Sequence, residues 1–420
     1  MFEYISRIIE DELDLALRSS GAVLIVGPKW CGKTSTAEIK SNSKIYMQNP
    51  DQFESNIKIA NIKPSLLLEG ETPRLIDEWQ VAPNLWDSVR YTVDRRGGVG
   101  HFILTGSAVP TDNKTMHTGT GRISRIVMRP MSLYESKNSN GSVSLGKVFE
   151  EKSLEASVSE LDIEDYAYLI CRGGWPASVG TNEEIAIRRT SDYINAVVNY
   201  DVAAVDGVEK NPNKVEQLLK SLSRNICTSA SIPTIIKDVL GSEETISENT
   251  VKSYMNALQR IFVIENLPAW SPSLRSKTAI RNSPKRLFVD PSLATASLGM
   301  TKDAVMKDFN FFGFLFEALC IRDLRIYAQS MGGKVFHYRD KNDFEIDAIV
   351  SLKDGTWGAI EIKLGDYEVD DAARNLLKLR EIIDSTKMKN PSFLMVLTGT
   401  RYSYKREDGV LVVPVGCLKN

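Results

Sequence analysis

Cysteine and histidine are scarce in this chain. Its 420 residues include three histidines and five cysteines, with no Cys-x-x-Cys pair. The cysteines are Cys31, Cys171, Cys227, Cys320 and Cys417. A zinc ribbon needs closely spaced thiolate or imidazole ligands, and a disulfide framework needs paired cysteines, so the sequence excludes both. Isolated cysteines suit a reducing compartment, and we expect a cytoplasmic protein.

Long apolar runs and a charge excess are missing as well. No apolar run approaches the roughly 20 residues that a membrane-spanning helix requires, and the charged amphipathic pattern of residues 2–10 is unlike a signal peptide. We therefore expect no membrane partner. The formal net charge of −2 argues against a protein that coats nucleic acid by charge alone, although local basic stretches remain. The length of 420 residues predicts two to four domains.

A phosphate-binding loop is the most specific motif that is present. Residues 27–34, GPKWCGKT, fit G-x-x-x-x-G-K-[ST]. The apolar run 22–26 before the motif predicts a buried strand and residues 34–39 predict a helix start, which is the context that the motif requires. Its glycines let backbone N–H groups turn toward phosphate oxygens at a helix N-terminus. A glycine-rich turn that matches by chance is the alternative.

This loop predicts a site for ATP and Mg²⁺. We expect Lys33 to reach the β- and γ-phosphates and the hydroxyl of Thr34 to ligate Mg²⁺. The residues expected to line the nucleotide site are Gly27, Pro28, Lys29, Trp30, Cys31, Gly32, Lys33, Thr34 and Ser35.

Two carboxylates follow a second apolar strand, about forty residues after the loop. Residues 74–78, RLIDE, place Asp77 and Glu78 at the end of that strand. We expect Asp77 to hold the Mg²⁺ shell and Glu78 to orient or polarise the attacking water. A polar strand end without function would be the simpler interpretation in isolation, but the phosphate loop favours the functional one.

Hydroxyl and guanidinium groups complete the expected site. The strand 101–105 ends in Thr105, and Ser107 follows, at the edge of the sheet where ligands bind; either is a candidate sensor of the γ-phosphate, and a plain turn is the alternative. Arg122, which we rank before Arg125, could place a guanidinium on the transferring phosphoryl group in cis or from a neighbouring subunit, so a homo-oligomer is compatible with the motif. A solvated arginine at a strand end is the alternative.

Together these motifs resemble a known family. The phosphate loop, LIDEWQ (75–80), FILTGS (102–107), TGTGR (118–122), RPMSLYE (129–135) and GGWP (173–176) are similar to the AAA-type P-loop ATPases of bacteria and archaea that carry a C-terminal domain of unknown function with a restriction-endonuclease-like fold. The resemblance covers essentially the whole chain. It implies an AAA-like core in which the strand that ends in Thr105 lies between two others, the strand before the phosphate loop and the strand that ends in Asp77. It also implies the roles given above for Lys33, Thr34, Asp77, Glu78 and Arg122.

Helical periodicity dominates the middle of the chain, from about 160 to 265. Residues 232–240, a helix that ends near 260, and the strand 262–267 form a winged helix-turn-helix pattern, whose second helix would enter a DNA groove. That helix offers few cations besides Lys252 and Arg260, so a module that only packs between its neighbours is the alternative. The basic stretch that follows suits phosphate contact, with a solvated linker as the equal alternative. Its cations are Arg275, Lys277, Arg281, Lys285 and Arg286.

Alternation along two predicted strands brings charged residues together near the end of the chain. In 344–350 and in 358–364 the even-numbered residues are apolar and face one side of the sheet. Asp347 on the first strand and Glu361 and Lys363 on the second have odd numbers, so they lie together on the other side. Asp347 and Glu361 are candidate ligands of Mg²⁺ or Mn²⁺, and Lys363 is a candidate for activating the water that attacks a phosphodiester. A half-exposed sheet with a Glu–Lys pair is the alternative.

Glu317 strengthens this interpretation. It lies in the apolar run 311–319, where an unpaired buried carboxylate would cost several kcal/mol, so it should face a cation. We therefore include Glu317 among the candidate metal ligands.

The expected fold is α/β. It comprises a P-loop AAA-like ATPase with a parallel sheet at 1–140, a helical linker or lid at 141–215, a winged helix-turn-helix at 216–275 and a restriction-endonuclease-like domain at 285–420. We expect a protein that binds and hydrolyses ATP with Mg²⁺ and acts on or near DNA, with a second Mg²⁺ or Mn²⁺ in the C-terminal domain. The alternative is a nucleotide-controlled protein-interaction switch whose nuclease-like domain is catalytically inactive.

Overall fold

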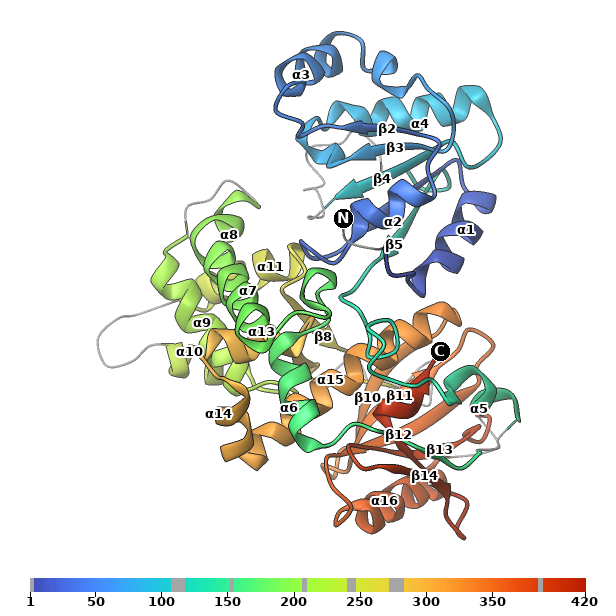
Figure 1. Ribbon diagram of the computed structural model, residues 1–420, viewed down its shortest axis with the longest axis vertical. Helices are drawn as coiled ribbons and strands as arrows, with labels where there is room; N and C mark the ends of the chain where they lie inside the picture. The colour runs from blue at the N-terminus through green and yellow to red at the C-terminus, as the bar shows by residue number, and fades with distance from the viewer. Residues whose placement is uncertain are drawn as a thin grey trace. The chain divides into compact units, whose positions relative to one another are not determined.

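The computed structural model describes residues 4–106, 118–151, 155–205, 210–239, 247–271, 283–383 and 388–420. The chain forms two compact units (Figure 1). One unit comprises Met1–Pro130 with two short segments, Ala204–Val208 and Arg260–Phe262, and the other comprises the remainder. The finer division into four domains remains a prediction.

Five parallel strands form the sheet of the first unit, in the order β2-β3-β4-β1-β5. They are β1 (Ala22–Val26), β2 (Ser43–Tyr46), β3 (Arg74–Asp77), β4 (Phe102–Gly106) and β5 (Ile123–Val127). The apolar pattern of the sequence predicts strands at 22–26, 44–47, 74–77, 101–105 and 123–128, and all five are confirmed to within one residue at each end. Strand β4 lies between β1 and β3, as the family resemblance implied.

Helices cover both faces of this sheet. On one face α1 (Ile9–Ser19) and α2 (Lys33–Ile39) pack against Val23 and Ile25 of β1. On the other face Leu24 contacts a core built by α3, a 3-10 turn and α4. Their bounds are Phe53–Ile62, Pro64–Leu68 and Asn84–Arg96, and a second 3-10 turn spans Trp79–Val81. A strand that is buried on both faces must be apolar throughout, which is why 22–26 reads as a continuous apolar run.

The second unit begins with two short strands, β6 (Val143–Ser144) and β7 (Ser157–Val158), around α5 (Leu145–Glu151). A helical region follows, in agreement with the sequence pattern. Its helices are α6 (Ile163–Arg172), a 3-10 turn (Pro176–Ser178), α7 (Glu183–Ala196), a π-helical turn (Val197–Asp201), α8 (Val202–Ala204), α9 (Pro212–Arg224), α10 (Ile232–Val239) and α11 (Glu248–Arg260).

An antiparallel hairpin joins this helical region to the C-terminal part. Strand β8 (Ile264–Leu267) pairs with β9 (Lys285–Phe288). Arg286 of β9 also exchanges backbone hydrogen bonds with residues 227–228, between α9 and α10. The two short helices α13 (Pro291–Ser297) and α14 (Lys302–Lys307) come next.

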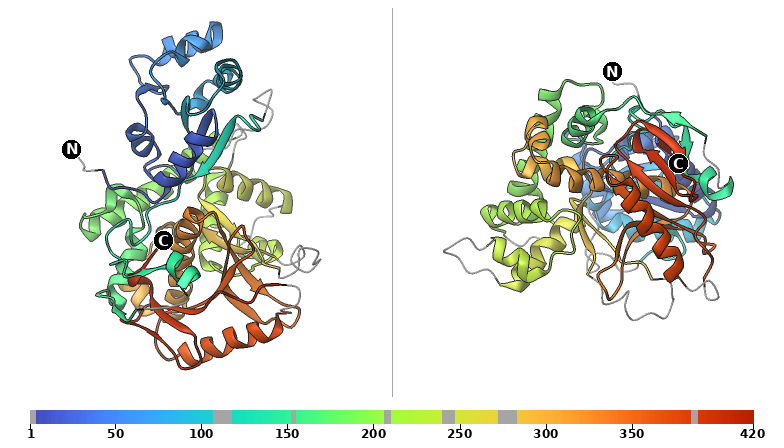
Figure 2. Two further views of the ribbon diagram at one scale, coloured as in Figure 1. Left: turned by 90° about the vertical axis from the view of Figure 1, so that its right-hand side faces the viewer. Right: turned by 90° about the horizontal axis from the view of Figure 1, so that it is seen from below.

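From residue 309 onward the sequence pattern predicts a helix, three strands, a helix and a strand, and the C-terminal part follows this order. These elements are α15 (Phe309–Ser330), β10 (Lys334–Arg339), β11 (Glu345–Ser351), β12 (Trp357–Lys363), α16 (Val369–Ile382) and β13 (Leu394–Thr398). They are followed by β14 (Tyr402–Lys405), β15 (Leu411–Pro414), a 3-10 turn (Val415–Cys417) and β16 (Leu418–Lys419). Helices α15 and α16 lie on opposite sides of the sheet (Figures 1 and 2).

Seven strands form this sheet, in the order β10-β11-β12-β13-β15-β14-β7. The edge strand β7 comes from a segment that the sequence placed in a helical linker, and β6 likewise pairs with β16 at the end of the chain. Two-residue strands carry no readable alternation, so the sequence could not reveal these pairings.

The state of the cysteines and the character of the helices bear on two expectations from the sequence, the absence of a disulfide framework and of membrane-spanning segments. The five cysteines are all buried and none of them forms a disulfide. None of the described helices combines the length and the apolar character needed to cross a membrane.

A buried arginine organises the interior of the second unit. The guanidinium of Arg322, on α15, lies 2.8 Å from Asp290 Oδ2 and 2.7 Å from Asp323 Oδ1. Asp323 Oδ2 accepts the backbone N–H of Leu133, and Asp290 Oδ2 accepts that of Gly174, each at 2.9 Å. All three charged side chains are almost completely buried. This network therefore links four segments that lie far apart in the sequence.

The same network accounts for the GGWP motif. The backbone N–H of Met131 donates to the carbonyl of Gly174 at 2.6 Å, and a Cβ at Gly174 would lie 2.1 Å from the carbonyl oxygen of Met131. Only glycine permits so close an approach of two backbones. The indole N–H of Trp175 donates to Ser292 Oγ at 3.0 Å, which anchors the motif to the start of α13.

Replacing the buried arginine should destabilise the second unit. We expect Arg322→Met to lower the free energy of unfolding by about 3–5 kcal/mol, because Asp290 and Asp323 would stay buried without a counter-charge. Urea denaturation of the full chain measures this change. The control is Arg188→Met, which breaks an exposed pair with Asp192 and should change the unfolding free energy by less than about 1 kcal/mol. Equal losses in the two variants would contradict the role of the network.

Candidate functional site

The phosphate loop connects β1 to α2, as predicted. Gly27 has φ 156° and Gly32 has φ 99°, both in the region that glycine adopts most easily. A Cβ at Gly27 would lie 2.1 Å from the carbonyl oxygen of Met128. The loop therefore requires glycine for its backbone conformation and for its contact with the segment after β5.

Lys33 lies inside this loop. Its side chain is buried, and Nζ donates to the carbonyl oxygens of Gly27 at 3.1 Å and of Pro28 at 2.7 Å. The oxygens of a phosphate carry more negative charge than these carbonyl oxygens. A phosphate that enters the loop would therefore bind the ammonium group of Lys33 more strongly than they do. Of the other loop residues, Lys29, Trp30 and Ser35 are exposed, Gly32 and Thr34 are partly buried, and Cys31 is buried. The thiol of Cys31 points to the Met128 carbonyl, 3.6 Å away, so only its backbone can face a ligand.

Three polar side chains from three elements meet beside the loop. Asp77 Oδ1, at the end of β3, accepts hydrogen bonds from the hydroxyls of Thr34 at 2.7 Å and of Thr105 at 2.6 Å. The hydroxyl of Thr105 also accepts the backbone N–H of Glu78 at 3.3 Å. The structure thus brings the predicted Thr34, Asp77, Glu78 and Thr105 together. Thr105 contacts both acidic residues, whereas Ser107, the other sensor candidate, lies outside the described residues.

Glu78 adopts an unusual conformation directly after β3. Its φ of 54° is left-handed, and its carboxylate accepts a hydrogen bond from the side-chain amide of Gln80. Burial raises the pKa of Glu78 above its ordinary value, although the charge of Lys33 and the Gln80 hydrogen bond act in the opposite direction. Sequence analysis did not single out Gln80, because a glutamine two residues after a carboxylate has no signature of its own.

Arg122 lies at the wrong edge of the sheet for a role in cis. Its carbonyl accepts the N–H of Ala22, the first residue of β1, whereas the phosphate loop follows the last residue of that strand. At about 3.3 Å per residue the two ends of β1 are roughly 13 Å apart. The guanidinium instead forms an exposed pair with Asp94, with Nε 2.8 Å from Oδ1. Of the two contacts that the sequence left open, the parallel register therefore does not favour the one within a single subunit. Only the contact from a neighbouring subunit remains as a proposal.

Arg7 is a residue of this site that sequence analysis missed. Its buried guanidinium donates to the carbonyl of Cys31 in the phosphate loop at 2.6 Å and to the carbonyl of Arg129 at 2.8 Å. It thereby braces the loop against the chain that follows β5. The amphipathic pattern of residues 2–10 gave no sign of this contact, since an arginine at a helix start is usually solvated.

The C-terminal charged residues also come together. Lys363 Nζ lies 3.1 Å from Glu361 Oε2 and 3.5 Å from Asp347 Oδ2, and Asp347 Oδ2 accepts the N–H of Ile362 at 2.9 Å. Glu317 is buried and faces a cation, as its surroundings predicted. That cation is Lys285 of β9, whose Nζ lies 2.7 Å from Glu317 Oε1.

Electrostatics tie these groups to one another. Burial raises the pKa of Glu317 to about 7, against the opposing charge of Lys285. Burial would raise the pKa of Asp347 too, but the ammonium groups of Lys285 and Lys363 outweigh it and lower that pKa to about 2. Burial and the neighbouring Asp347 raise the pKa of Glu361.

The expected metal site is not formed by these carboxylates as they stand. Within the described ranges, no group of three or more histidine, cysteine, aspartate or glutamate side chains is arranged to hold a metal ion. Each of the predicted ligands, Glu317, Asp347 and Glu361, has an ammonium group as its partner instead. The sequence pattern supplied the right carboxylates but could not show which cation neutralises them.

The basic stretch after the hairpin strand β8 needs a correction. Lys285 is buried in the carboxylate cluster and is not available to a phosphate. Arg286 is half-buried and donates to Asn266 Oδ1 at 3.0 Å. The other three predicted phosphate contacts, Arg275, Lys277 and Arg281, lie outside the described residues.

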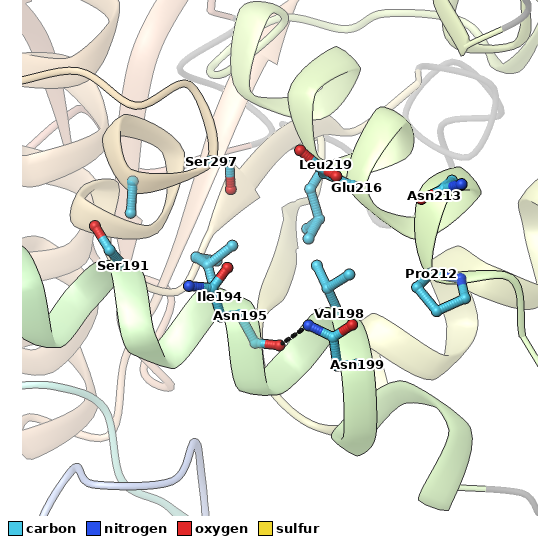
Figure 3. Close-up of a pocket in the computed structure, with 11 residues that line it drawn as sticks. Ser191, Ile194, Asn195, Val198, Asn199, Pro212, Asn213, Glu216, Leu219 and Ser297 are labelled. Carbon is cyan, nitrogen blue, oxygen red and sulfur yellow. Dashed lines mark hydrogen bonds between the residues drawn. The ribbon is translucent and has the colours of Figure 1, made fainter.

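A separate cavity of about 200 Å³ lies in the second unit between α7, α9 and α13 (Figure 3). Asn195, Asn199 and Asn213 contribute to its wall, and Glu216 is the one charged residue among the described residues that line it. A wall with a carboxylate and no cation does not suit a phosphate-bearing ligand. No residue predicted from the sequence lines this cavity.

Two curated proteins and two solved structures are similar to this chain over most of its length. The uncharacterized proteins Rv2008c of Mycobacterium tuberculosis and Mb2031c of Mycobacterium bovis are each 23% identical over 357 residues, which are 83% of this chain and 71% of theirs. A Walker-type ATPase of Pyrococcus abyssi has 16% identity and a TM-score of 0.42, over 70% of this chain and 96% of that chain. The Aeropyrum pernix ORC1 protein in complex with DNA has 13% identity and a TM-score of 0.25, over 69% of this chain and 91% of that chain.

Three family models match successive parts of the chain. Residues 163–304 and 312–418 match two domains of unknown function, DUF8612 and DUF4143. Residues 19–137 match the family described as AAA domain, and this segment contains the phosphate loop, the Asp77–Glu78 pair and the five-stranded parallel sheet. Residues 19–137 are therefore similar to the AAA domain family.

Proposed function

We propose that the first unit binds ATP with Mg²⁺ and hydrolyses it. The observation that supports this proposal is the convergence of Thr34 and Thr105 on one oxygen of Asp77, beside the phosphate loop and Lys33. The hydroxyl of Thr34 and the carboxylate of Asp77 are hard oxygen ligands that suit Mg²⁺, and the bound ion would supply charge neutralisation on the phosphates.

Lys33, Glu78 and Thr105 have separate roles in binding the phosphates, activating the water molecule and positioning the acidic residues. Lys33 exchanges its two loop carbonyls for oxygens of the β- and γ-phosphates. Glu78 orients a water molecule and accepts its proton, while the water oxygen bonds to the γ-phosphorus and the bond to the bridging oxygen of ADP breaks. ADP and inorganic phosphate are the products. Thr105 is a positioning residue, because its hydroxyl holds the carboxylate of Asp77 and the backbone of Glu78.

Lys33→Ala and Glu78→Gln should separate binding from turnover. Lys33→Ala removes the ammonium from the loop, and we expect ATP affinity to fall below detection. Glu78→Gln keeps the loop intact but cannot accept the proton, so ATP should bind normally while hydrolysis falls by roughly 10²–10⁴-fold. Isothermal titration with ATP and phosphate release measure both quantities. Undiminished turnover by Glu78→Gln would refute the assignment.

Thr105→Val should impair turnover without impairing binding. Valine matches the shape of threonine but cannot donate to Asp77 or accept from Glu78, so we expect kcat to fall about 10-fold or more with little change in ATP affinity. Thr105→Ser restores the hydroxyl and serves as the control. A valine variant that hydrolyses ATP as fast as its serine counterpart would show that the hydroxyl has no positioning role.

For the second unit we infer an interaction module with a nuclease-like fold rather than a nuclease. The order of α15, β10, β11, β12, α16 and β13 supports the restriction-endonuclease-like fold. The pairing of Lys285 and Lys363 with the three carboxylates favours a cluster that is neutralised by the protein itself. The second unit would then act as a partner-binding domain that the nucleotide state of the first unit controls.

A winged helix-turn-helix is the proposal for the region around α11. Helices α9, α10 and α11 and the β8–β9 hairpin follow one another in the order that this fold requires, and residues 227–228, between α9 and α10, form backbone hydrogen bonds with Arg286 of the hairpin. Contact with DNA has weaker support, because Lys252, on the exposed face of α11, is paired with Glu248 at 2.5 Å. Helical spacing in the sequence predicts that Val251, Tyr254, Met255 and Leu258 share one face of this helix, and all four are buried.

DNA should therefore have little effect on ATP hydrolysis. We expect single- and double-stranded DNA to change the hydrolysis rate of the full chain by less than about 2-fold at low salt, where phosphate contacts are strongest. If DNA does change the rate, Lys252→Ala shows whether the exposed face of α11 is responsible, because the effect should then be smaller in this variant. Stimulation of about 10-fold or more, reduced by added salt, would instead support an ATP-driven enzyme on DNA.

A further inference from the structure

Lys285 is the least expected member of the carboxylate cluster. Only 5% of its side chain is exposed. Its Nζ lies 2.7 Å from Glu317 Oε1 of α15 and 3.5 Å from Asp347 Oδ1 of β11. The ammonium thus lies where carboxylates from two elements converge, in the surroundings that a bound cation would occupy.

A divalent ion and this ammonium would compete for the same oxygens. Mg²⁺ and Mn²⁺ prefer several oxygen ligands at about 2.0–2.2 Å, and Glu317 and Asp347 are two of the three carboxylates that the cluster offers. Two positive charges a few ångströms apart in a buried site would also repel each other strongly. Lys363 neutralises the third carboxylate, Glu361, at 3.1 Å. Two ammonium groups therefore pair with all three carboxylates, and Asp347 is shared by both of them.

The cation comes from outside the sheet that supplies the carboxylates. Lys285 begins β9, which pairs with β8 and contacts residues 227–228. Asp347 and Glu361 instead belong to β11 and β12 of the seven-stranded sheet. The ion pairs of Lys285 consequently connect the hairpin to α15 and to this sheet.

We propose that Lys285 is the resident cation of this cluster: it takes the place of a divalent metal ion, keeps such ions out, and fastens the β8–β9 hairpin to the C-terminal sheet. The proposal rests on the interaction-module function proposed above for the second unit. It does not depend on ATP hydrolysis by the first unit.

Manganese binding to the nucleotide-free full chain tests the proposal. The wild-type protein and Asp347→Asn should bind the same number of Mn²⁺ ions, because the cluster of the wild type admits none. Lys285→Met, which removes the charge but keeps the length of the side chain, should bind about one more Mn²⁺ per chain, because Glu317 and Asp347 are then released from Lys285 and can act as ligands. Adding Asp347→Asn to Lys285→Met should abolish that extra ion. Titration calorimetry or the electron paramagnetic resonance of free Mn²⁺ counts the ions.

Thermal unfolding provides a second readout. Lys285→Met should unfold at a lower temperature than the wild type, and Mn²⁺ should restore part of the loss in this variant only. Arg286→Met is the matched control, since it removes the neighbouring cation of the same strand, which donates to Asn266 instead of to the cluster. This control should gain no Mn²⁺ ion.

Two results would overturn the proposal. One is a wild-type protein that binds one Mn²⁺ more than Asp347→Asn, because the metal would then share the cluster with Lys285. The other is a folded Lys285→Met variant that binds no extra Mn²⁺. If Lys285→Met does not fold, the comparison of the wild type with Asp347→Asn still decides. Mn²⁺-dependent DNA cleavage that Asp347→Asn abolishes would refute both this proposal and the interaction module, whereas a lack of ATP hydrolysis would refute only the function of the first unit.

Discussion

The buried charge of Arg322 is the constraint around which the second unit is built. A guanidinium in a protein interior is tolerated only when carboxylates neutralise it and hydrogen bonds satisfy those carboxylates in turn. Asp290 and Asp323 provide the charge, and the backbone N–H groups of Leu133 and Gly174 complete their hydrogen bonding. Segments from residue 131 to residue 323 must therefore assemble together.

The same rule governs the carboxylate cluster of the C-terminal sheet. Three carboxylates on adjacent elements can be neutralised by a metal ion or by ammonium groups, and this chain supplies Lys285 and Lys363. Three clustered carboxylates are thus compatible with a role in binding rather than in cleavage. Fold and function separate at this point, because the fold depends on the strand order and the chemistry depends on which cation is present.

The ATP site depends on a different constraint, the parallel sheet. Parallel strands place all their carboxyl ends at one edge, so Asp77 at the end of β3 and Thr105 in β4 meet Thr34, which follows the loop after β1. Only glycine at position 27 lets the loop pass the carbonyl of Met128. The contacts of Arg7 hold this loop in place from a segment that precedes the sheet in the sequence.

The sequence alone determined the features that depend on local pattern. It identified the phosphate loop, the five strands of the first sheet and the burial face of α11, because apolar periodicity and glycine spacing are written in consecutive residues. It also showed that Glu317 needs a cation, since the residues around it are apolar. Which cation it finds was decided by the tertiary structure, because Lys285 lies 32 residues away on a strand of another sheet. The tertiary structure also decided three other features. Arg122 lies at the end of β1 that is remote from the phosphate loop, Arg7 holds that loop in place, and β6 and β7 pair with C-terminal strands. Each depends on strand register or on a long-range contact, and neither leaves a periodic trace in the sequence.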